Sequence, residues 1–114
     1  MSDVGEFVKV ATVEQLPVGA ALGIELPDGT RVCLANSDGE IYAILDRCTH
    51  RDFPMSNGSV HGGGTIECAW HGARFDMKTG RAIRLPAIKA IKTFEVKIEG
   101  NDVLLLGTWE RGSV

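Results

Sequence analysis

Short apolar runs separated by turn signals divide most of the chain. The dipeptides Asp28-Gly29, Asp38-Gly39 and Gly100-Asn101 each stand between two such runs. Dipeptides of this kind between apolar segments are strong signals for β-hairpins. The pattern therefore predicts antiparallel strands over residues 21–26, 31–35, 40–45, 93–99 and 102–106.

The run 93–99 alternates strictly between apolar and polar residues, which places Phe94, Val96 and Ile98 on one face. That alternation is typical of a half-buried antiparallel strand. No segment of ten or more residues shows a helical period. Residues 12–16 predict only a single capped turn, ended by Pro17. We therefore expect an all-β fold, an antiparallel β-sandwich or small barrel of hairpins.

Residues 46–86 break this pattern, because the alternation fades and Gly, Pro, Cys and His concentrate there. All three histidines and two of the three cysteines lie in this segment. A loop-rich segment of this length is uncommon unless it is functional. The 114 residues suffice for one domain. We expect a single domain over 1–114 in which 46–86 forms a loop-rich subdomain inserted in a β base.

Charge and hydropathy narrow the environment in which the protein works. Twelve Lys and Arg against fifteen Asp and Glu give a net charge of −3 without a basic run, so nucleic acid is not an expected partner. The longest apolar-looking stretch without charge, 15–24, is broken by Pro17 and two glycines, whereas a membrane span needs about 20 apolar residues. The first residues do not resemble a signal peptide. We expect a cytoplasmic monomer with reduced thiols and no membrane contact.

Two pairs of metal-binding residues stand out within the 46–86 segment. Cys48 and His50 form one pair, and Cys68 and His71 form the other. Thiolate and imidazole suit zinc or iron–sulfur chemistry, but the order Cys, His, Cys, His differs from that of a typical zinc finger. Residues two apart on an extended loop project the same way, roughly 6–7 Å apart. Two loops could therefore bind two irons, one through Cys48 and Cys68 and the other through His50 and His71.

The two pairs also resemble a known motif. Cys48-Thr49-His50 with Cys68-Ala69-Trp70-His71-Gly72 is similar to the motif of Rieske [2Fe–2S] proteins, in which two histidines replace two cysteines on one iron. The resemblance extends over about residues 7–106 and includes Asp46, Phe75-Asp76 and Leu85-Pro86.

Within the Rieske family, the short format resembles the ferredoxin component of bacterial ring-hydroxylating oxygenase systems. The resemblance implies one [2Fe–2S] cluster per chain, bound by Cys48, His50, Cys68 and His71, and a one-electron carrier without an active site of its own. The implied partners are a flavoprotein reductase fed by NAD(P)H and a terminal oxygenase. Two alternatives stay open: the Rieske-type small subunit of an assimilatory nitrite reductase, and a zinc-stabilised binding module without a redox role.

Four positions depart from the respiratory Rieske proteins that the family includes. Those proteins carry a further cysteine in each loop, paired as a disulfide, where Phe53 and Trp70 stand here. They also carry Ser and Tyr hydroxyls that donate hydrogen bonds to cluster sulfurs, where Ala73 and Phe75 stand here. Without these donors we expect a reduction potential near the low end of the Rieske range, about −150 mV.

The remaining candidates receive more ordinary interpretations. We expect His61 to be an exposed loop residue without a ligand role, and Cys33 to be a buried apolar filler in a strand. Apolar residues beside the ligand pairs are expected to shield the cluster from water, and part of this surface is expected to dock the redox partners. The expected docking contacts are Pro54, Met55, Trp70 and Pro86.

Overall fold

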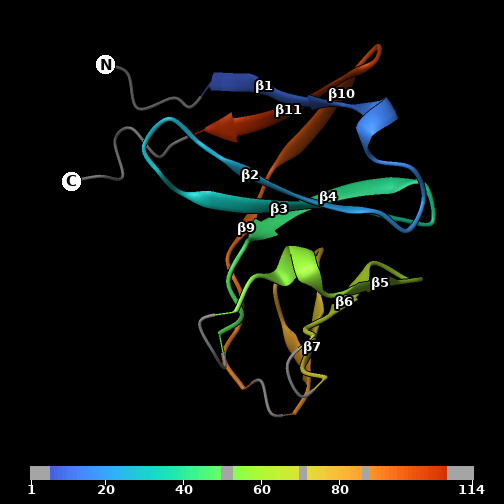
Figure 1. Ribbon diagram of the computed structural model, residues 1–114, viewed down its shortest axis with the longest axis vertical. Coiled ribbons are helices and arrows are strands. Elements are labelled where there is room, and N and C mark those ends of the chain that lie inside the picture. The colour runs from blue at the N-terminus through green and yellow to red at the C-terminus, as the bar shows by residue number, and fades with distance from the viewer. Residues whose placement is uncertain (1–5, 50–52, 70–71, 86–87, 108–114) are drawn as a thin grey trace.

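The computed structural model describes residues 6–49, 53–69, 72–85 and 88–107. These residues form β-strands and two single-turn 3-10 helices (Figure 1), which confirms the all-β expectation. The first half contains β1 (Glu6–Thr12), η1 (Val13–Gln15), β2 (Ala21–Glu25), β3 (Arg31–Ser37), β4 (Glu40–Leu45) and η2 (Met55–Asn57). The second half contains β5 (Ser59–His61), β6 (Thr65–Glu67), β7 (Arg74–Asp76), β8 (Ala82–Arg84), β9 (Thr93–Phe94), β10 (Val96–Glu99) and β11 (Asp102–Gly107).

The strands pair into three antiparallel sheets, with strand orders β1-β11-β10, β2-β3-β4-β9 and β5-β6-β7-β8. Figure 1 shows them stacked from top to bottom in that order. The first two sheets form the β base. The third sheet follows the first ligand pair along the chain, and the second ligand pair lies between its strands β6 and β7. We call β5–β8 the lower sheet.

The middle sheet has a buried core on each face. In β3, Val32 and Leu34 belong to the core shared with β11, whereas Cys33 and Ala35 belong to the core shared with the lower sheet. Successive side chains of a strand point to opposite faces, so β3 separates the two cores. This explains why Val32 to Ser37 are all buried and why the sequence of β3 shows no polar alternation.

The predicted strand over 93–99 is divided between two sheets. Residues 93–94 form β9, which pairs with β4, whereas β10 pairs with β11 in the sheet β1-β11-β10. The chain passes from one sheet to the other at Glu95, whose carbonyl accepts a hydrogen bond from the Leu106 N–H at 2.9 Å. Of the three residues expected on one face of a half-buried strand, Phe94 and Val96 pack against the core, whereas Ile98 is 46% exposed on the outer strand β10.

The segment 46–86 contains more regular structure than its sequence indicates. Its four strands have three residues each, which is too short for an alternating pattern to be visible. The turn between β5 and β6 is attached to the base at Ser37. The Ser37 hydroxyl donates to the His61 carbonyl at 2.6 Å and accepts from the Gly64 N–H at 2.9 Å.

The predicted turn after residue 12 is confirmed as η1. The Thr12 N–H donates to Oε1 of Gln15 at 2.9 Å, which is the reciprocal contact of a capping box. Strand β1 before it was not predicted. Among the described residues, neither 3-10 turn nor any other helical segment is long and apolar enough to cross a bilayer.

Candidate metal centre

Cys48 and Cys68 lie in the same buried core, although twenty positions separate them in the sequence. Cys48 follows β4 and is 3% exposed, and Cys68 follows β6 and is 1% exposed. Both belong to the core that also contains Met55 and Ile66. None of the three cysteines is in a disulfide. The structure thus places the two predicted sulfur donors in a region that excludes water.

Each of these cysteines begins a loop that is closed in the same way. The Cys48 N–H donates to the Phe53 carbonyl at 2.9 Å, and the Cys68 N–H donates to the Ala73 carbonyl at 2.6 Å. In both loops the acceptor stands five residues after the cysteine. We call 48–53 the first ligand loop and 68–73 the second. The predicted ligands His50 and His71 fall within these loops but lie outside the described residues.

A buried carboxylate joins the two sides of the first ligand loop. Asp46 precedes the loop, and Ser56 follows it in η2. Oδ1 of Asp46 accepts from the Ser56 N–H at 2.7 Å, and Oδ2 accepts from the Ser56 hydroxyl at 2.8 Å. The Asp46 side chain is fully buried, with a guanidinium nitrogen of Arg31 3.9 Å from Oδ2. We call these two hydrogen bonds the Asp46–Ser56 clamp.

Strand β2 leaves little room beside this clamp. A Cβ atom at Gly23 would lie 2.8 Å from Oδ2 of Asp46 and 2.9 Å from the Ser56 hydroxyl oxygen. Real Cβ atoms do not approach other atoms so closely, so the absence of a side chain at Gly23 permits the clamp to pack against the base.

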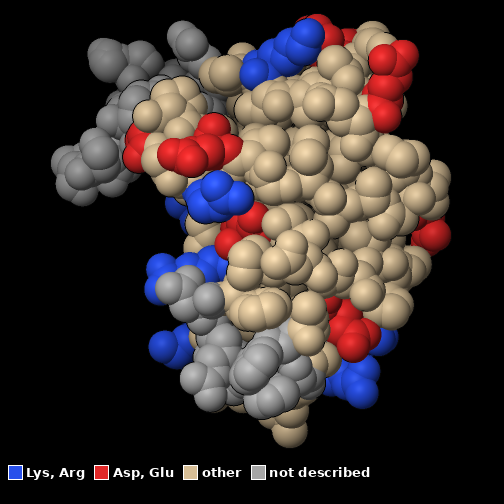
Figure 2. Space-filling model, viewed as in Figure 1, with Lys and Arg blue, Asp and Glu red and all other residues tan. Residues whose placement is uncertain are grey.

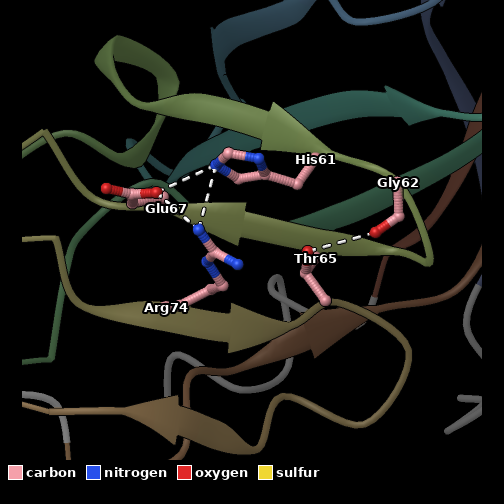
Figure 3. A network of polar contacts seen from close by, with 5 residues as sticks. All are labelled: His61, Gly62, Thr65, Glu67 and Arg74. Atoms are coloured by element: carbon pink, nitrogen blue, oxygen red, sulfur yellow. Dashed lines mark hydrogen bonds and ion pairs between the residues drawn. The ribbon is translucent and has the colours of Figure 1, made fainter.

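An ion pair joins the two sides of the second ligand loop. Glu67 ends β6 just before the loop, Arg74 begins β7 just after it, and the two are directly opposite in the antiparallel register. Nη2 of Arg74 donates to Oε1 of Glu67 at 2.8 Å. Nε2 of His61 lies 2.9 Å from the same oxygen, so side chains from β5, β6 and β7 meet on one face of the lower sheet (Figure 3).

These contacts change the interpretation of two residues. The hydrogen bond from Arg74, and then that from His61, lower the pKa of the Glu67 carboxyl below its usual range. The carboxylate is therefore charged at neutral pH and attracts the guanidinium. The expectation of an exposed loop histidine is wrong, because His61 is half-buried on β5 and contacts this ion pair.

Burial also corrects the expected docking surface. Met55 is fully buried in the core that contains Cys48, so it cannot contact a partner, and its inclusion among the docking residues is wrong. Phe53 and Pro54 are half-buried. Trp70 and Pro86, the other expected contacts, lie outside the described residues. Met55 instead belongs to the core that contains Cys48.

The positions of the two absent hydroxyl donors lie in the same core as the predicted cysteine ligands. Ala73 ends the second ligand loop, Phe75 lies on β7, and both are fully buried. Cys33 is also fully buried there, on β3, which confirms it as a core residue. Burial raises the pKa of the Cys33 thiol, and the nearby charge of Asp46 raises it further. Unlike Cys48 and Cys68, Cys33 lies within a strand and has no histidine near it in the sequence.

Comparison with known proteins agrees with this arrangement. A family profile described as "Rieske [2Fe-2S] domain" matches residues 6–95. The biphenyl dioxygenase ferredoxin subunit of Pseudomonas sp. (strain KKS102) is 35% identical over 99 residues, which cover 87% of this chain and 90% of that protein. The 3-phenylpropionate/cinnamic acid dioxygenase ferredoxin subunit of Escherichia coli K12 is 41% identical over 93 residues, covering 82% and 86% of the two chains.

A solved structure also superimposes over most of the chain. It is the ferredoxin of carbazole 1,9a-dioxygenase from Nocardioides aromaticivorans IC177, with a TM-score of 0.81 and 31% sequence identity. The match covers 88% of this chain and 96% of that one.

Proposed function

We propose that this chain, which belongs to the Rieske [2Fe–2S] domain family, is the ferredoxin of an aromatic-ring-hydroxylating oxygenase system. In this role it receives single electrons from an NAD(P)H-dependent flavoprotein reductase and delivers them to a terminal oxygenase in the cytoplasm. The chain acts as a monomer and catalyses no reaction on the aromatic substrate. The names of its relatives, which are ferredoxin subunits of dioxygenases, support this role.

The proposed ligands of the single [2Fe–2S] cluster are Cys48 and Cys68 on one iron and His50 and His71 on the other. When bound, the cluster would supply reversible one-electron chemistry, at a higher potential than an all-cysteine cluster because imidazole is neutral and thiolate is charged. We further propose that 1–114 is one Rieske domain in which 46–86 is the cluster-binding subdomain.

The observation that supports this function most strongly is the pairing of the two ligand loops. Two cysteines, each almost fully buried, begin two loops with the same closing hydrogen bond and lie in one core. Two cysteines brought together from separate loops, each with a histidine close in the sequence, match the donor set of a Rieske cluster, which is bound by two cysteines and two histidines. A purely structural role for two cysteines would not require the same loop closure at both.

The surrounding residues hold the loops and exclude water. The Asp46–Ser56 clamp and the Glu67–Arg74 pair join the two sides of the first and second ligand loops. Buried Met55 belongs to the same core as Cys48. Because such outer contacts orient metal ligands, we assign these residues a positioning role.

Purification with iron and sulfide analysis tests the proposal directly. We expect a red-brown protein with about two irons and two acid-labile sulfides per chain, as the [2Fe–2S] formula requires. Single Cys48→Ser, Cys68→Ser, His50→Ala and His71→Ala variants should each lose the cluster. Cys33→Ser is the matched control, because Cys33 is a cysteine buried in the same core and should not be a ligand.

Two results would contradict the proposal. Zinc without sulfide would indicate the zinc-stabilised binding module instead. Loss of the visible absorption in Cys33→Ser, to the extent seen in Cys68→Ser, would show that the assigned ligand set is wrong.

A further inference from the structure

The charged residues are distributed unevenly along the chain, with most of the basic residues in its middle segment. Residues 46–92 contain eight Lys and Arg against four Asp and Glu, whereas the remaining residues contain four against eleven. The net charge is thus +4 over 46–92 and −7 elsewhere, although the whole chain carries −3. Although the whole chain is negatively charged, the segment 46–92, which includes both ligand loops, is positively charged.

The described acidic residues of 46–92 are also less exposed than most of the described basic ones, so the surface of this segment is more positive than its composition alone indicates. Among the described acids of 46–92, Asp46 is buried in the clamp, and Glu67 and Asp76 are half-buried. Figure 2 shows blue atoms along both sides of the lower half of the molecule. The exposed charged residues that the structure describes in this range are all basic: Arg47, Lys78, Arg81, Arg84, Lys89 and Lys92.

One segment connects the two ligand loops and exposes apolar side chains between two of these cations. Arg84 lies opposite Arg74, the residue that follows the second loop. The Lys89 carbonyl accepts a hydrogen bond from the Thr49 hydroxyl of the first loop at 2.8 Å. Between them, Leu85 is 73% exposed and Ile88 is 80% exposed. Large apolar side chains this exposed beside a functional site are typical of an interaction surface.

We propose that Arg84, Leu85, Ile88 and Lys89 form the docking surface for the terminal oxygenase, and that the oxygenase presents an acidic face around an apolar centre. This inference rests on the proposed function. The two cations attract the acidic face and orient the approach. The two apolar side chains then provide a small contact that forms and separates quickly, as transient electron-transfer complexes require.

Ferricyanide, a hydrophilic trianion, serves as a first probe of the charge at this surface. One electron leaves the reduced protein, and iron(III) in ferricyanide becomes iron(II). The protein is reduced with dithionite, separated from excess reductant and mixed with ferricyanide at several salt concentrations. A positive docking surface predicts that the rate constant falls as salt rises. The net charge of −3 would predict the opposite trend.

A pair of double variants separates local charge from net charge. Arg84→Gln with Lys89→Gln should lower the ferricyanide rate constant roughly tenfold at low salt, from the Coulomb attraction of two charges at about 10 Å. Lys9→Gln with Lys97→Gln removes the same charge from exposed positions of the base and should change it less than about twofold. Chemical shifts of the oxidised protein titrated with redox-inert hexacyanocobaltate(III) should move at 84–89 and not near Lys9.

A second trianion tests the apolar part. The cobalt(III) complex of bathophenanthroline disulfonate has the same charge as ferricyanide but presents aromatic surface. Leu85→Ser with Ile88→Ser should slow its reduction several-fold while leaving the ferricyanide rate unchanged. Val18→Ser is the control, because Val18 is 68% exposed on the base and should affect neither rate.

The outcomes distinguish the two levels of the proposal. A protein that contains no reducible cluster would overturn the proposed function, and the docking surface with it. A reducible cluster with a ferricyanide rate that rises with salt, or with equal effects of the two charge variants, would overturn the docking surface alone. So would equal slowing of both probes by Leu85→Ser with Ile88→Ser.

Discussion

Removal of the Asp46 carboxylate should release the first ligand loop. In Asp46→Ala, the Ser56 N–H and hydroxyl both lose an acceptor, at distances of 2.7 and 2.8 Å. A hydrogen bond to a charged group contributes about 1.5–3 kcal/mol. Ser56 is half-buried, so water can partly replace the lost acceptor, and we take the low end of the range for each bond. The expected cost is about 3 kcal/mol.

This cost should appear as faster loss of the cluster. If metal escapes through a local opening of the loop, its rate follows the population of the open form. A cost of about 3 kcal/mol multiplies that population roughly 150-fold, since each 1.4 kcal/mol is tenfold. Ser56→Ala removes only the hydroxyl bond and leaves the N–H bond, so it should accelerate loss roughly tenfold. The decay of visible absorption in the presence of an iron chelator measures both rates.

Asn36 supplies a matched control in the base. Its buried side chain also makes two hydrogen bonds, to the Leu16 carbonyl and from the Gly39 N–H. Asn36→Ala should lower the midpoint of thermal unfolding without accelerating cluster loss under native conditions. The clamp would have no positioning role if Asp46→Ala kept its cluster as long as the wild type, or if Asn36→Ala lost it just as quickly.

Two further predictions concern the core around the cysteines. Ala73→Ser and Phe75→Tyr introduce hydroxyls at fully buried positions of that core. Each hydroxyl should donate a hydrogen bond to a cluster sulfur and raise the reduction potential by roughly 40–90 mV. A lower potential in voltammetry, with the cluster intact, would contradict this prediction. Met55→Glu places a carboxylate in the same core and should abolish cluster assembly, because an unpaired buried charge is costly. The control Met55→Leu should retain full iron content. A Met55→Glu protein with full iron content would show that the site is open to water.

The sequence alone predicted the two ligand pairs because their signal is local. Cys48 and Cys68 are each close in the sequence to a histidine, and the structure places both thiols in one core. The assignment of all four residues, Cys48, His50, Cys68 and His71, as ligands stays a prediction, as does the 46–86 boundary. Hairpin turns and alternation similarly located most strands of the base, since both signals lie within a few residues.

Contacts that depend on the tertiary arrangement could not be predicted in this way. Ser56 stands ten residues from Asp46 with nothing in its type to mark it as a partner. The docking role expected for Met55 failed because an apolar residue beside a ligand loop has the same sequence signal whether it points inward or outward. Glu67 and Arg74 did leave a signal, since opposite charges directly flank the second ligand loop.

The two contacts that join the sides of the ligand loops differ in how deeply they are buried, and therefore in how much each contributes to stability. The Asp46 side chain is fully buried, and a buried carboxylate is tolerated only when its oxygens are hydrogen-bonded, so Asp46 and Ser56 depend on each other. Glu67 and Arg74 keep 29% and 30% of their side-chain surface exposed, where an ion pair contributes only about 0–1 kcal/mol. The clamp therefore contributes more to joining Asp46 and Ser56 than the ion pair contributes to joining Glu67 and Arg74. A side chain at Gly23 would crowd both oxygens of the clamp, so a substitution there should weaken the closure of the first loop.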